Sequence, residues 1–323
     1  MELEGRRVFV TGGAGFIGSH LVDRLVGITR ETIVFDNLST GSLENLKHNM
    51  SKANLRFIHG DLLNPKEVSQ ALNDCSTVFH LAANPEVRVG AENTRIDFEQ
   101  NLVATRNLLE AMRENKNARN MIFTSTSTVY GEASQLPTTE EYAPLLPISL
   151  YGASKLGCEA LIAAYSHLFK IRTVIYRFAN IVGSRSKHGV IYDFIEKLRN
   201  ITSRLEILGD GTQAKSYMHI QDCVDAFLYG CEHAKSQVEI FNLGSEDRID
   251  VKAIAELVTE EMGLENVEFK LLGGPEGRGW LGDVKNMQLN ILKIKKLGWK
   301  PKYNSSQAVK LAAQEVLEET REK

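Results

Sequence analysis

The feature that most limits the fold of this chain is a series of six short, nearly continuous apolar runs, separated by segments with helical spacing. Strands buried on both faces of a parallel sheet have this composition, whereas strands with one solvent-facing side alternate apolar and polar residues. The sequence therefore predicts an α/β protein with a doubly wound, mainly parallel sheet and right-handed crossovers. The runs are residues 7–10, 32–35, 55–58, 77–81, 121–124 and 173–178, and the clearest helical segments are 16–26, 101–113 and 153–169.

The alternation ends near residue 180. Beyond it, strand-like runs at 205–208 and 239–243 are mixed with helical patterns at 192–199, 222–232, 251–262 and 305–319. This change predicts a first domain at 1–180 and a smaller, mixed α/β lobe at 181–323. We expect the chain to return to the main sheet around residues 217–245.

Composition excludes several classes of protein. The 38 basic and 41 acidic residues give a net charge of −3, which argues against a nucleic-acid-binding surface. No stretch approaches the roughly 18–20 consecutive apolar residues of a membrane span. The four cysteines lack metal-ligand or CxxC spacing, and the eight histidines contain no HxxxH pair. We therefore expect a cytoplasmic protein with buried, reduced thiols and no metal site.

A glycine-rich loop, TGGAGFIG, follows the first predicted strand directly and places glycines at 12, 15 and 18 before a helical segment. Such a loop lets backbone approach a pyrophosphate closely and presents the N–H groups of the helix to its phosphates. Glycines in ordinary turns could give the same spacing. However, Asp36 ends the second predicted strand, where dinucleotide-binding folds carry an acidic residue for the adenosine ribose. Together these features predict a Rossmann domain that binds NAD, because this carboxylate would repel the extra phosphate of NADP.

Two later strands also end in residues that suit the ligand edge of such a sheet. Asp61 follows the third predicted strand, where it would accept from the adenine amino group or cap the following helix. Ala82 and Ala83 follow the fourth, where they would let the cofactor lie close to the backbone or serve packing alone.

A tyrosine and a lysine open the helical segment near residue 151. Tyr151 and Lys155 are four residues apart and therefore share one helix face. The lysine ammonium, together with a positively charged nicotinamide, is expected to lower the tyrosine pKa, so that Tyr151 can act as a base on a sugar hydroxyl. A hydroxyl run at 124–128 ends the fifth predicted strand and could hydrogen-bond the reacting oxygen, although such runs also satisfy their own backbone.

These motifs, with YGASK, STSTVYG and the run Arg177-Phe178-Ala179-Asn180, resemble the extended short-chain dehydrogenases/reductases. The match is closest to the UDP-glucose (UDP-galactose) 4-epimerase branch of the NAD-dependent epimerase/dehydratase family. The resemblance implies that Thr126 is the catalytic hydroxyl, Tyr151 the base and Lys155 its partner. The implied NAD contacts are Gly12, Gly15, Phe16, Ile17, Gly18, Asp36, Asn37, Ser39, Thr40, Gly41, Asp61, Leu62, Leu81, Ala82, Ala83, Asn101, Ser125, Tyr151 and Lys155. The implied substrate contacts are Ser125, Thr126, Asn180, Val190, Leu205, Ile207, Lys215, Arg278 and Trp280.

The hydroxyl run narrows the implied reaction. Sugar 4,6-dehydratases resemble this segment but carry Thr-Asp-Glu, and UDP-glucuronate decarboxylases carry a glutamate there. This chain has Ser127 and Thr128, which cannot act as carboxyl acids or bases. The resemblance thus implies an isomerase that interconverts UDP-glucose and UDP-galactose through a transient 4-keto sugar, in galactose metabolism. UDP-GlcNAc/UDP-GalNAc epimerisation and uronic-acid epimerisation stay open, since Trp280 could restrict the sugar or be plain packing.

The resemblance also implies a homodimer. The helical segments at 101–113 and 153–169 would form a four-helix contact between two copies, in addition to packing on their own sheet.

Overall fold

The computed structural model describes residues 1–321 and divides into two compact units. The first comprises Met1–Val129, Ser149–Arg177 and Phe227–Phe241, and the second comprises Tyr130–Ile148, Phe178–Ala226 and the chain from Asn242 onward. The chain passes from the first unit to the second between Arg177 and Phe178, close to the predicted boundary at residue 180. The excursion at Tyr130–Ile148 was not predicted, because its polar, proline-containing sequence has no clear periodicity.

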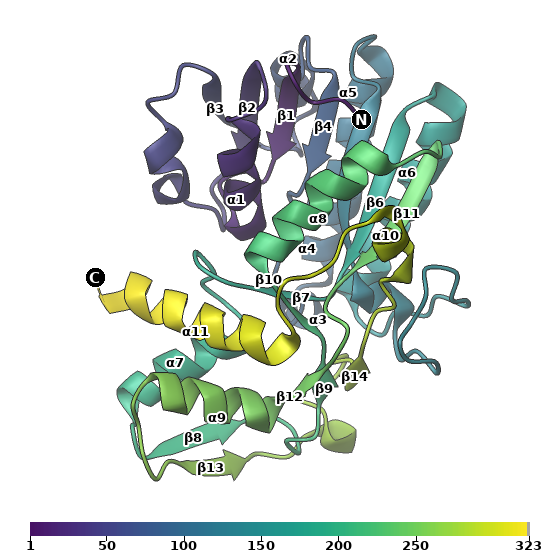
Figure 1. The fold of residues 1–323 in the computed structure, drawn as a ribbon. Coiled ribbons are helices and arrows are strands. Elements are labelled where there is room, and N and C mark those ends of the chain that lie inside the picture. The colour runs from purple at the N-terminus through teal and green to yellow at the C-terminus, as the bar shows by residue number, and fades with distance from the viewer. Residues whose placement is uncertain (322–323) are drawn as a thin grey trace. The chain divides into compact units, whose positions relative to one another are not determined.

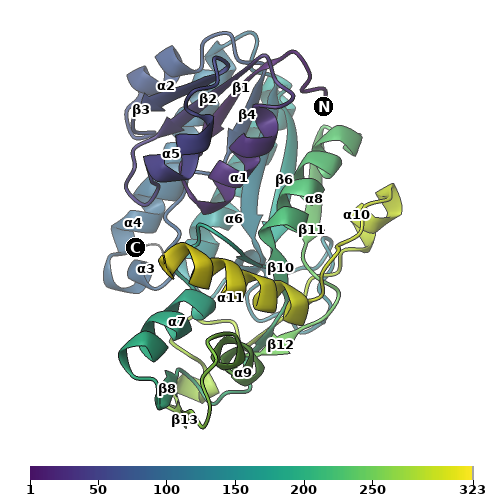
Figure 2. The same cartoon turned by 60° about the vertical axis from the view of Figure 1, so that its left-hand side comes forward.

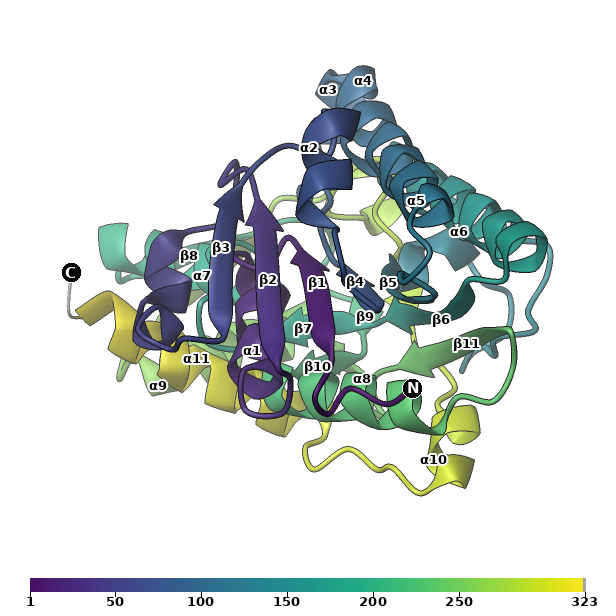
Figure 3. The ribbon, with the colours of Figure 1, turned by 90° about the horizontal axis from the view of Figure 1, so that it is seen from above.

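The first unit is built on a seven-stranded sheet with the order β11-β6-β5-β4-β1-β2-β3 (Figures 1 and 3). The pairs β1–β2, β1–β4, β2–β3 and β4–β5 are all parallel. The chain builds outward from β1 in one direction and then from β4 in the other, so the strand order reverses between these two strands. This is the doubly wound α/β fold that the sequence predicted. The strands are β1 (Arg7–Thr11), β2 (Glu31–Asp36), β3 (Leu55–His59), β4 (Thr77–His80), β5 (Asn120–Thr126), β6 (Arg172–Phe178) and β11 (Val238–Leu243).

Burial explains the composition of these strands. In β4 every residue is buried, and in β1, β2, β5 and β6 all but the first are. Figure 3 shows α2, α5 and α6 on one face of the sheet and α1 and α8 on the other. The helices are α1 (Phe16–Leu25), α2 (Pro65–Ala71), α3 (Val89–Glu92), α4 (Thr94–Asp97), α5 (Ala104–Glu114), α6 (Leu150–Phe169) and α8 (Ile220–His233), with the 3₁₀ turns η1 (Leu43–Asn49) and η3 (Ser127–Tyr130) and a π-helical turn, η2 (Phe98–Val103).

The second unit has its own core. Helices α7, α9 and α11 pack against one another, and α9 also packs against β8 (Figure 2). Their apolar faces bury a cluster that includes Phe194, Leu205, Ile254 and Val309. The strands pair as β10–β7, β12–β9–β14 and β13–β8. The elements are β7 (Asn180–Val182), α7 (Val190–Asn200), β8 (Arg204–Ile207), β9 (Ala214–Lys215), β10 (Tyr217–His219), β12 (Ile249–Asp250), α9 (Val251–Glu261), β13 (Glu268–Leu271), η4 (Pro275–Gly277), β14 (Asn286–Met287), α10 (Leu292–Leu297) and α11 (Ser305–Arg321).

Helix ends follow local chemistry. Ser149 caps α6 by accepting a hydrogen bond from the Gly152 N–H, and Asn64 caps α2 in the same way through the Lys66 N–H. Pro65 occupies the first turn of α2, where its missing N–H costs nothing. Within residues 1–321, no helix is both long enough and apolar enough to cross a membrane.

Candidate active site

The predicted glycine loop joins β1 to α1 with the geometry that a phosphate site requires. Gly12 has φ of +69°, and a Cβ there would lie 2.6 Å from the Ala82 nitrogen. A Cβ on Gly18 would lie 2.1 Å from the Gly12 carbonyl oxygen. Side chains at either position would therefore close the turn. Gly15 begins α1 without any side-chain cap, so the first N–H groups of this helix remain available to phosphates.

Asp36 ends β2 beside this loop. It is 8% exposed; one carboxylate oxygen accepts from the Ala14 N–H at 2.9 Å and the other from the Leu38 N–H at 2.8 Å. Burial raises the pKa of Asp36, and the two backbone hydrogen bonds oppose that shift. The carboxylate thus ties the glycine loop to the segment after β2. The residues predicted in that segment follow at once: Asn37 accepts from the Ser39 N–H at 3.0 Å, Thr40 is exposed, and Gly41 packs on Ala14.

Replacing Asp36 with alanine is expected to weaken NAD binding by about 10–100-fold, because hydrogen bonds to charged groups contribute roughly 1.5–3 kcal/mol. Calorimetric titration of NAD into protein stripped of nucleotide measures this. Asp23→Ala, on α1, is the matched control: its carboxylate pairs with His48 and Asn49, away from the loop. Equal affinities in the two variants would contradict the assignment.

The segments that follow β3 and β4 also carry predicted cofactor residues. Asp61 accepts from the Leu63 N–H at 2.8 Å and from Asn37 Nδ2 at 3.2 Å, and it does not cap α2, since Asn64 does. Leu62 is buried, whereas Leu81, Ala82 and Ala83 are partly exposed. Ala82 donates its N–H to Thr11 Oγ1 at 3.3 Å. The end of β4 therefore lies directly against Gly12, as the predicted close approach of cofactor and backbone requires.

The residues present thus fit NAD: a glycine cradle that a Cβ would fill, uncapped helix N–H groups, and a carboxylate at the end of β2. Gly12, Gly15 and Gly18 would hold the pyrophosphate with the N-terminus of α1, and Asp36 would hold the adenosine ribose.

The predicted catalytic lysine is fixed against the strand that carries Thr126. Tyr151 and Lys155 lie in the first two turns of α6. The Lys155 side chain is 2% exposed, and its Nζ donates to the Thr124 carbonyl at 2.8 Å and lies 4.7 Å from the centre of the Phe123 ring. Thr126 ends β5 and is buried, and its Oγ1 accepts from the Thr128 N–H at 3.2 Å. The hydrogen bond from Lys155 to Thr124 thus fixes the start of α6 against the end of β5.

The electrostatics of this pair correct one expectation. Burial raises the pKa of Tyr151 far above its usual value, and Asp97 and Cys158 add to that effect. Burial lowers the pKa of Lys155 to about 8, while Cys158, Glu159 and Asp97 oppose the change. The protein's own groups therefore raise the tyrosine pKa, whereas the sequence analysis expected Lys155 and the nicotinamide together to lower it. Without a nicotinamide, Tyr151 is held as the neutral phenol.

Ser125 makes a buried contact that the sequence analysis did not predict. Its hydroxyl donates to Glu159, a buried residue one turn after Lys155 on α6. Glu159 also accepts hydrogen bonds from two Arg177 nitrogens, the closest at 2.7 Å, and the two side chains form a buried ion pair. In this structure the Ser125 hydroxyl proton is donated to Glu159, and its contact with sugar and cofactor stays a prediction. Glu159 lies four residues after Lys155 on the same helix face, but nothing in the sequence pairs it with Ser125.

Asn101 is likewise engaged by the protein. It is 2% exposed, its Oδ1 accepts from the Asn84 N–H at 2.9 Å, and its Nδ2 donates to Ser154 Oγ at 2.8 Å and towards Asp97 at 3.4 Å. Its amide connects the segment after β4 to α6. The contact of Asn101 with NAD stays a prediction. Asp97, Asn84 and Glu159 were missed by sequence analysis, because a lone polar residue in a helical segment or a loop resembles an ordinary surface position.

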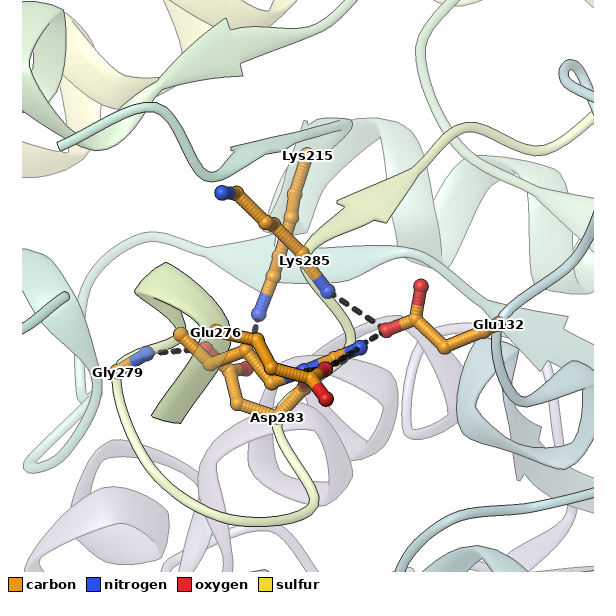
Figure 4. Close-up of polar contacts among 7 residues, drawn as sticks. Glu132, Lys215, Glu276, Gly279, Asp283 and Lys285 are labelled. Carbon is orange, nitrogen blue, oxygen red and sulfur yellow. Dashed lines mark hydrogen bonds and ion pairs between the residues drawn. The ribbon is translucent and has the colours of Figure 1, made fainter. Parts of the chain in front are cut away.

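In the second unit, Lys215 and Arg278 both donate to Asp283, and Figure 4 shows Lys215 beside it. Lys215 Nζ donates to Asp283 Oδ1 at 2.5 Å, and Arg278 donates to the Asp283 carbonyl at 2.8 Å. Arg278 also donates to Glu132 and, at 3.2 Å, to Glu276, and the bond to Glu132 raises its pKa. The structure thus brings the two predicted phosphate-binding cations together, each already paired with a carboxylate. The partner Glu132 lies in the unpredicted excursion.

The other predicted substrate residues are more dispersed. Asn180 begins β7 and donates its N–H to the Ser216 carbonyl at 3.2 Å, next to Lys215. Val190 begins α7 and is partly exposed. Leu205 and Ile207 are fully buried in the core of the unit, so at these two positions only the backbone could contact a ligand. Trp280 is partly exposed, and its ring covers Gly282.

Comparisons with known proteins agree with this geometry. A sequence model of the NAD dependent epimerase/dehydratase family matches residues 8–244. A protein described as a putative UDP-glucose 4-epimerase from Methanocaldococcus jannaschii is 33% identical over 309 residues, 94% of this chain and 96% of the relative.

Solved structures extend the match over nearly the whole chain. A crystal structure of a UDP-galactose 4-epimerase is 41% identical, with a TM-score of 0.86 over 97% of this chain and 99% of that chain. A UDP-N-acetylglucosamine 4-epimerase from Methanobrevibacter ruminantium, solved with UDP-N-acetylmuramic acid, is 28% identical, with a TM-score of 0.87 over 98% of this chain and 100% of that one. The chain therefore belongs to the NAD-dependent epimerase/dehydratase family and is an enzyme that uses NAD as its cofactor.

Proposed function

We propose that this enzyme interconverts UDP-glucose and UDP-galactose by inverting the configuration at C4 of the sugar. The M. jannaschii relative is described as a putative UDP-glucose 4-epimerase and the 41%-identical structure as a UDP-galactose 4-epimerase, and both support this assignment. The catalytic cluster supports it independently, because its groups suit reversible oxidation of a secondary alcohol.

One arrangement carries the proposal. Lys155 fixes the start of α6 against β5, and the hydroxyl run that begins at the end of β5 contains no carboxylate. Lys155 is hydrogen-bonded to the backbone of β5, and Thr126, the last residue of that strand, directly precedes Ser127 and Thr128. A dehydratase or decarboxylase of this family would need an acid or base in this run. Hydroxyl groups can orient the substrate oxygen but cannot eliminate water or carboxyl groups from a sugar.

The roles of the residues follow from their positions. Thr126 would hydrogen-bond the sugar 4-OH, and Tyr151 would remove its proton and later return it. Lys155 would stabilise the tyrosinate through its ammonium charge. When bound, NAD supplies the acceptor and then the donor of the C4 hydride. Epimerisation requires the sugar to present its other face between the two transfers, so net redox change is zero.

We propose that the first unit binds NAD and the second the nucleotide part of the substrate. Lys215 and Arg278 would bind the diphosphate, and the backbone of β8 would lie along the uracil. Diphosphate oxygens would compete for Arg278 with Glu132 and Glu276, whose carboxylates occupy its donors in this structure.

We assign glucose and galactose rather than their N-acetyl forms because of Trp280. An indole ring at this point of the Arg278–Asp283 loop would restrict the space near the sugar C2. The ring lies over Gly282, where an added Cβ would come within 2.9 Å of it.

A panel of UDP-sugars tests the proposal. Purified protein is incubated without added reductant with UDP-glucose, UDP-galactose, UDP-GlcNAc, UDP-GalNAc or UDP-glucuronate, and the products are separated by chromatography. Interconversion of the first two at the highest kcat/KM is expected. Turnover of the N-acetyl or uronic sugars alone would redirect the substrate assignment, and no turnover of any would refute the epimerase.

Replacing Arg278 with alanine is expected to raise KM for UDP-galactose by about 10–100-fold with a smaller change in kcat, because a charged hydrogen-bonding group lost from ground-state binding contributes roughly 1.5–3 kcal/mol. Steady-state kinetics measure both constants. Arg199→Ala, on α7, is the control, since this arginine pairs with Glu196. A fall in kcat at constant KM would contradict a role in binding the diphosphate.

We also propose a homodimer formed by the outer faces of α5 and α6. Large apolar side chains remain exposed on or beside these helices: Phe98 is 55% exposed and Leu168 is 72% exposed. Sedimentation of the purified enzyme would show a dimer that Phe98→Glu weakens. A monomer at all concentrations would contradict the proposal.

A further inference from the structure

A buried carboxylate lies beside the catalytic helix and is not used by the chemistry described above. Asp97 ends α4 and is 1% exposed, and α4 packs against α6. Its Oδ1 accepts from Asn84 Nδ2 at 3.0 Å and from Asn101 Nδ2 at 3.4 Å. Within residues 1–321 its Oδ2 is buried and has no hydrogen-bond partner. Leaving a carboxylate oxygen buried and unpaired is costly, so its retention here calls for a physical reason.

The local backbone makes room for this oxygen. A Cβ built on Gly90 would lie 2.1 Å from Asp97 Oδ2, so only glycine leaves the space that the carboxylate occupies. The π-helical turn η2 begins immediately after Asp97, and such turns often accompany functional sites. Both features hold the carboxyl group at one place rather than letting it turn to solvent.

Two routes connect Asp97 to the catalytic pair. The first is through hydrogen bonds, from Asp97 to Asn101 and from Asn101 to Ser154, which lies between Tyr151 and Lys155 on α6. The second is through charge, because Asp97 raises the pKa of Tyr151 and opposes the lowering of the pKa of Lys155.

We propose that Asp97 is a positioning residue of the epimerase, whose buried negative charge, held through Asn84 and Asn101, sets the pH range in which Tyr151 and Lys155 work. The proposal rests on the function proposed above. As an anion near both groups, Asp97 makes each harder to deprotonate. Lys155 thereby keeps its proton despite burial, and Tyr151 gives up its proton only when the positive nicotinamide is present. Free tyrosinate would then be confined to the NAD-loaded enzyme.

Other charged groups lie on α6, on the segment of Asp97 itself and beside α3. On α6, Tyr151 and Lys155 face it, and Glu159 acts on Lys155 from the following turn. On its own segment, Arg95 and Glu99 pair with each other at the surface at 2.5 Å. Beside α3, Arg88 lies 3.9 Å from Glu86, and Glu92 is exposed to solvent. Solvent screens these exposed pairs. The thiol of Cys158, on α6, acts on both Tyr151 and Lys155, and the buried Glu159 acts on Lys155 alone, so Asp97 is the carboxylate whose charge reaches both.

The test compares Asp97→Asn with the wild type by two readouts. Removing the negative charge makes proton loss easier for both groups, so both limbs of the pH profile of kcat/KM for UDP-galactose should move to lower pH, by about one unit. The tyrosinate absorbance of the NAD-loaded enzyme, with the Tyr151→Phe signal subtracted, should shift the same way. Glu99→Gln removes an exposed carboxylate two residues away and should shift neither.

A second variant keeps the test decisive if Asp97→Asn does not fold. Asn84→Ala keeps the carboxyl group but removes the amide that stabilises its charged form, so it should give a smaller shift to lower pH. A folded Asp97→Asn enzyme with reduced kcat but unmoved limbs would show a merely structural role and overturn the proposal. If that variant does not fold, unmoved limbs in Asn84→Ala overturn it instead. Failure of the epimerase assignment is distinguishable, because it removes wild-type turnover but leaves the tyrosinate titration measurable.

Discussion

Tyr151→Phe is expected to lower kcat by about 10³-fold while leaving NAD content and the KM for UDP-sugar close to those of the wild type. The change removes one oxygen, the atom that would take the proton from the sugar 4-OH, and a general base contributes roughly 10²–10⁴-fold. Phenylalanine keeps the ring and therefore the packing of the α6 start. Single-turnover and steady-state assays with UDP-galactose measure the loss, and absorbance of the nucleotide released on denaturation measures NAD content.

The matched control is Tyr165→Phe, on the same helix, whose hydroxyl donates to Glu110. It is expected to keep kcat within about twofold, since surface substitutions away from a site usually change little. If the Tyr151→Phe enzyme were active, another group would have to be the base, and the proposed mechanism would lose its main support. Loss of NAD in that variant would instead show that the hydroxyl serves binding.

The fold was accessible from the sequence because the signals for it are local. Each of the six predicted runs coincides with a strand of the sheet, and the helical periodicity at 153–169 coincides with most of α6. The glycine loop and Asp36 lie together because the parallel strands β1 and β2 pair and end at the same edge. Strand pairing converts a motif in sequence into a site in space, so these residues could be placed without coordinates.

The contacts inside the site were not accessible, because they depend on partners far apart in the chain. Ser125 looks like a free hydroxyl in sequence, and only folding brings it to Glu159. Arg278 looks like a free guanidinium, and only folding brings it to Glu132, which is 146 residues away. Tyr151 was expected to have a pKa lowered by Lys155 and the nicotinamide, but in the protein alone burial raises it, and Asp97 and Cys158 add to that effect. Periodicity predicts faces and edges, whereas desolvation and long-range pairing need the three-dimensional structure.

Lys155→Met is expected to lose activity and gain stability. The pKa of Lys155 falls from 10.5 in the unfolded chain to about 8 when folded, because burial disfavours its charge. Between these two pH values the unfolded chain binds more protons, so wild-type stability rises with pH through the window. Below pH 8 the full cost of burying the charge is present. At about 1.4 kcal/mol per pH unit that cost is about 3 kcal/mol, and the lost bond to the Thr124 carbonyl offsets about 1 kcal/mol.

At pH 7 the methionine variant should therefore unfold at a higher denaturant concentration than the wild type, by about 2 kcal/mol in free energy. The difference should shrink as the pH rises from 8 towards 10.5, where wild-type Lys155 is neutral in both states. Urea unfolding across this range, with exposed Lys66→Met as control, measures it. Activity should fall by about 10²–10⁴-fold, because methionine cannot supply the positive charge that stabilises the Tyr151 phenolate. A variant that is both inactive and less stable would mean that the lysine holds the fold. A stable, inactive one would mean that the enzyme keeps a costly buried charge for its chemistry.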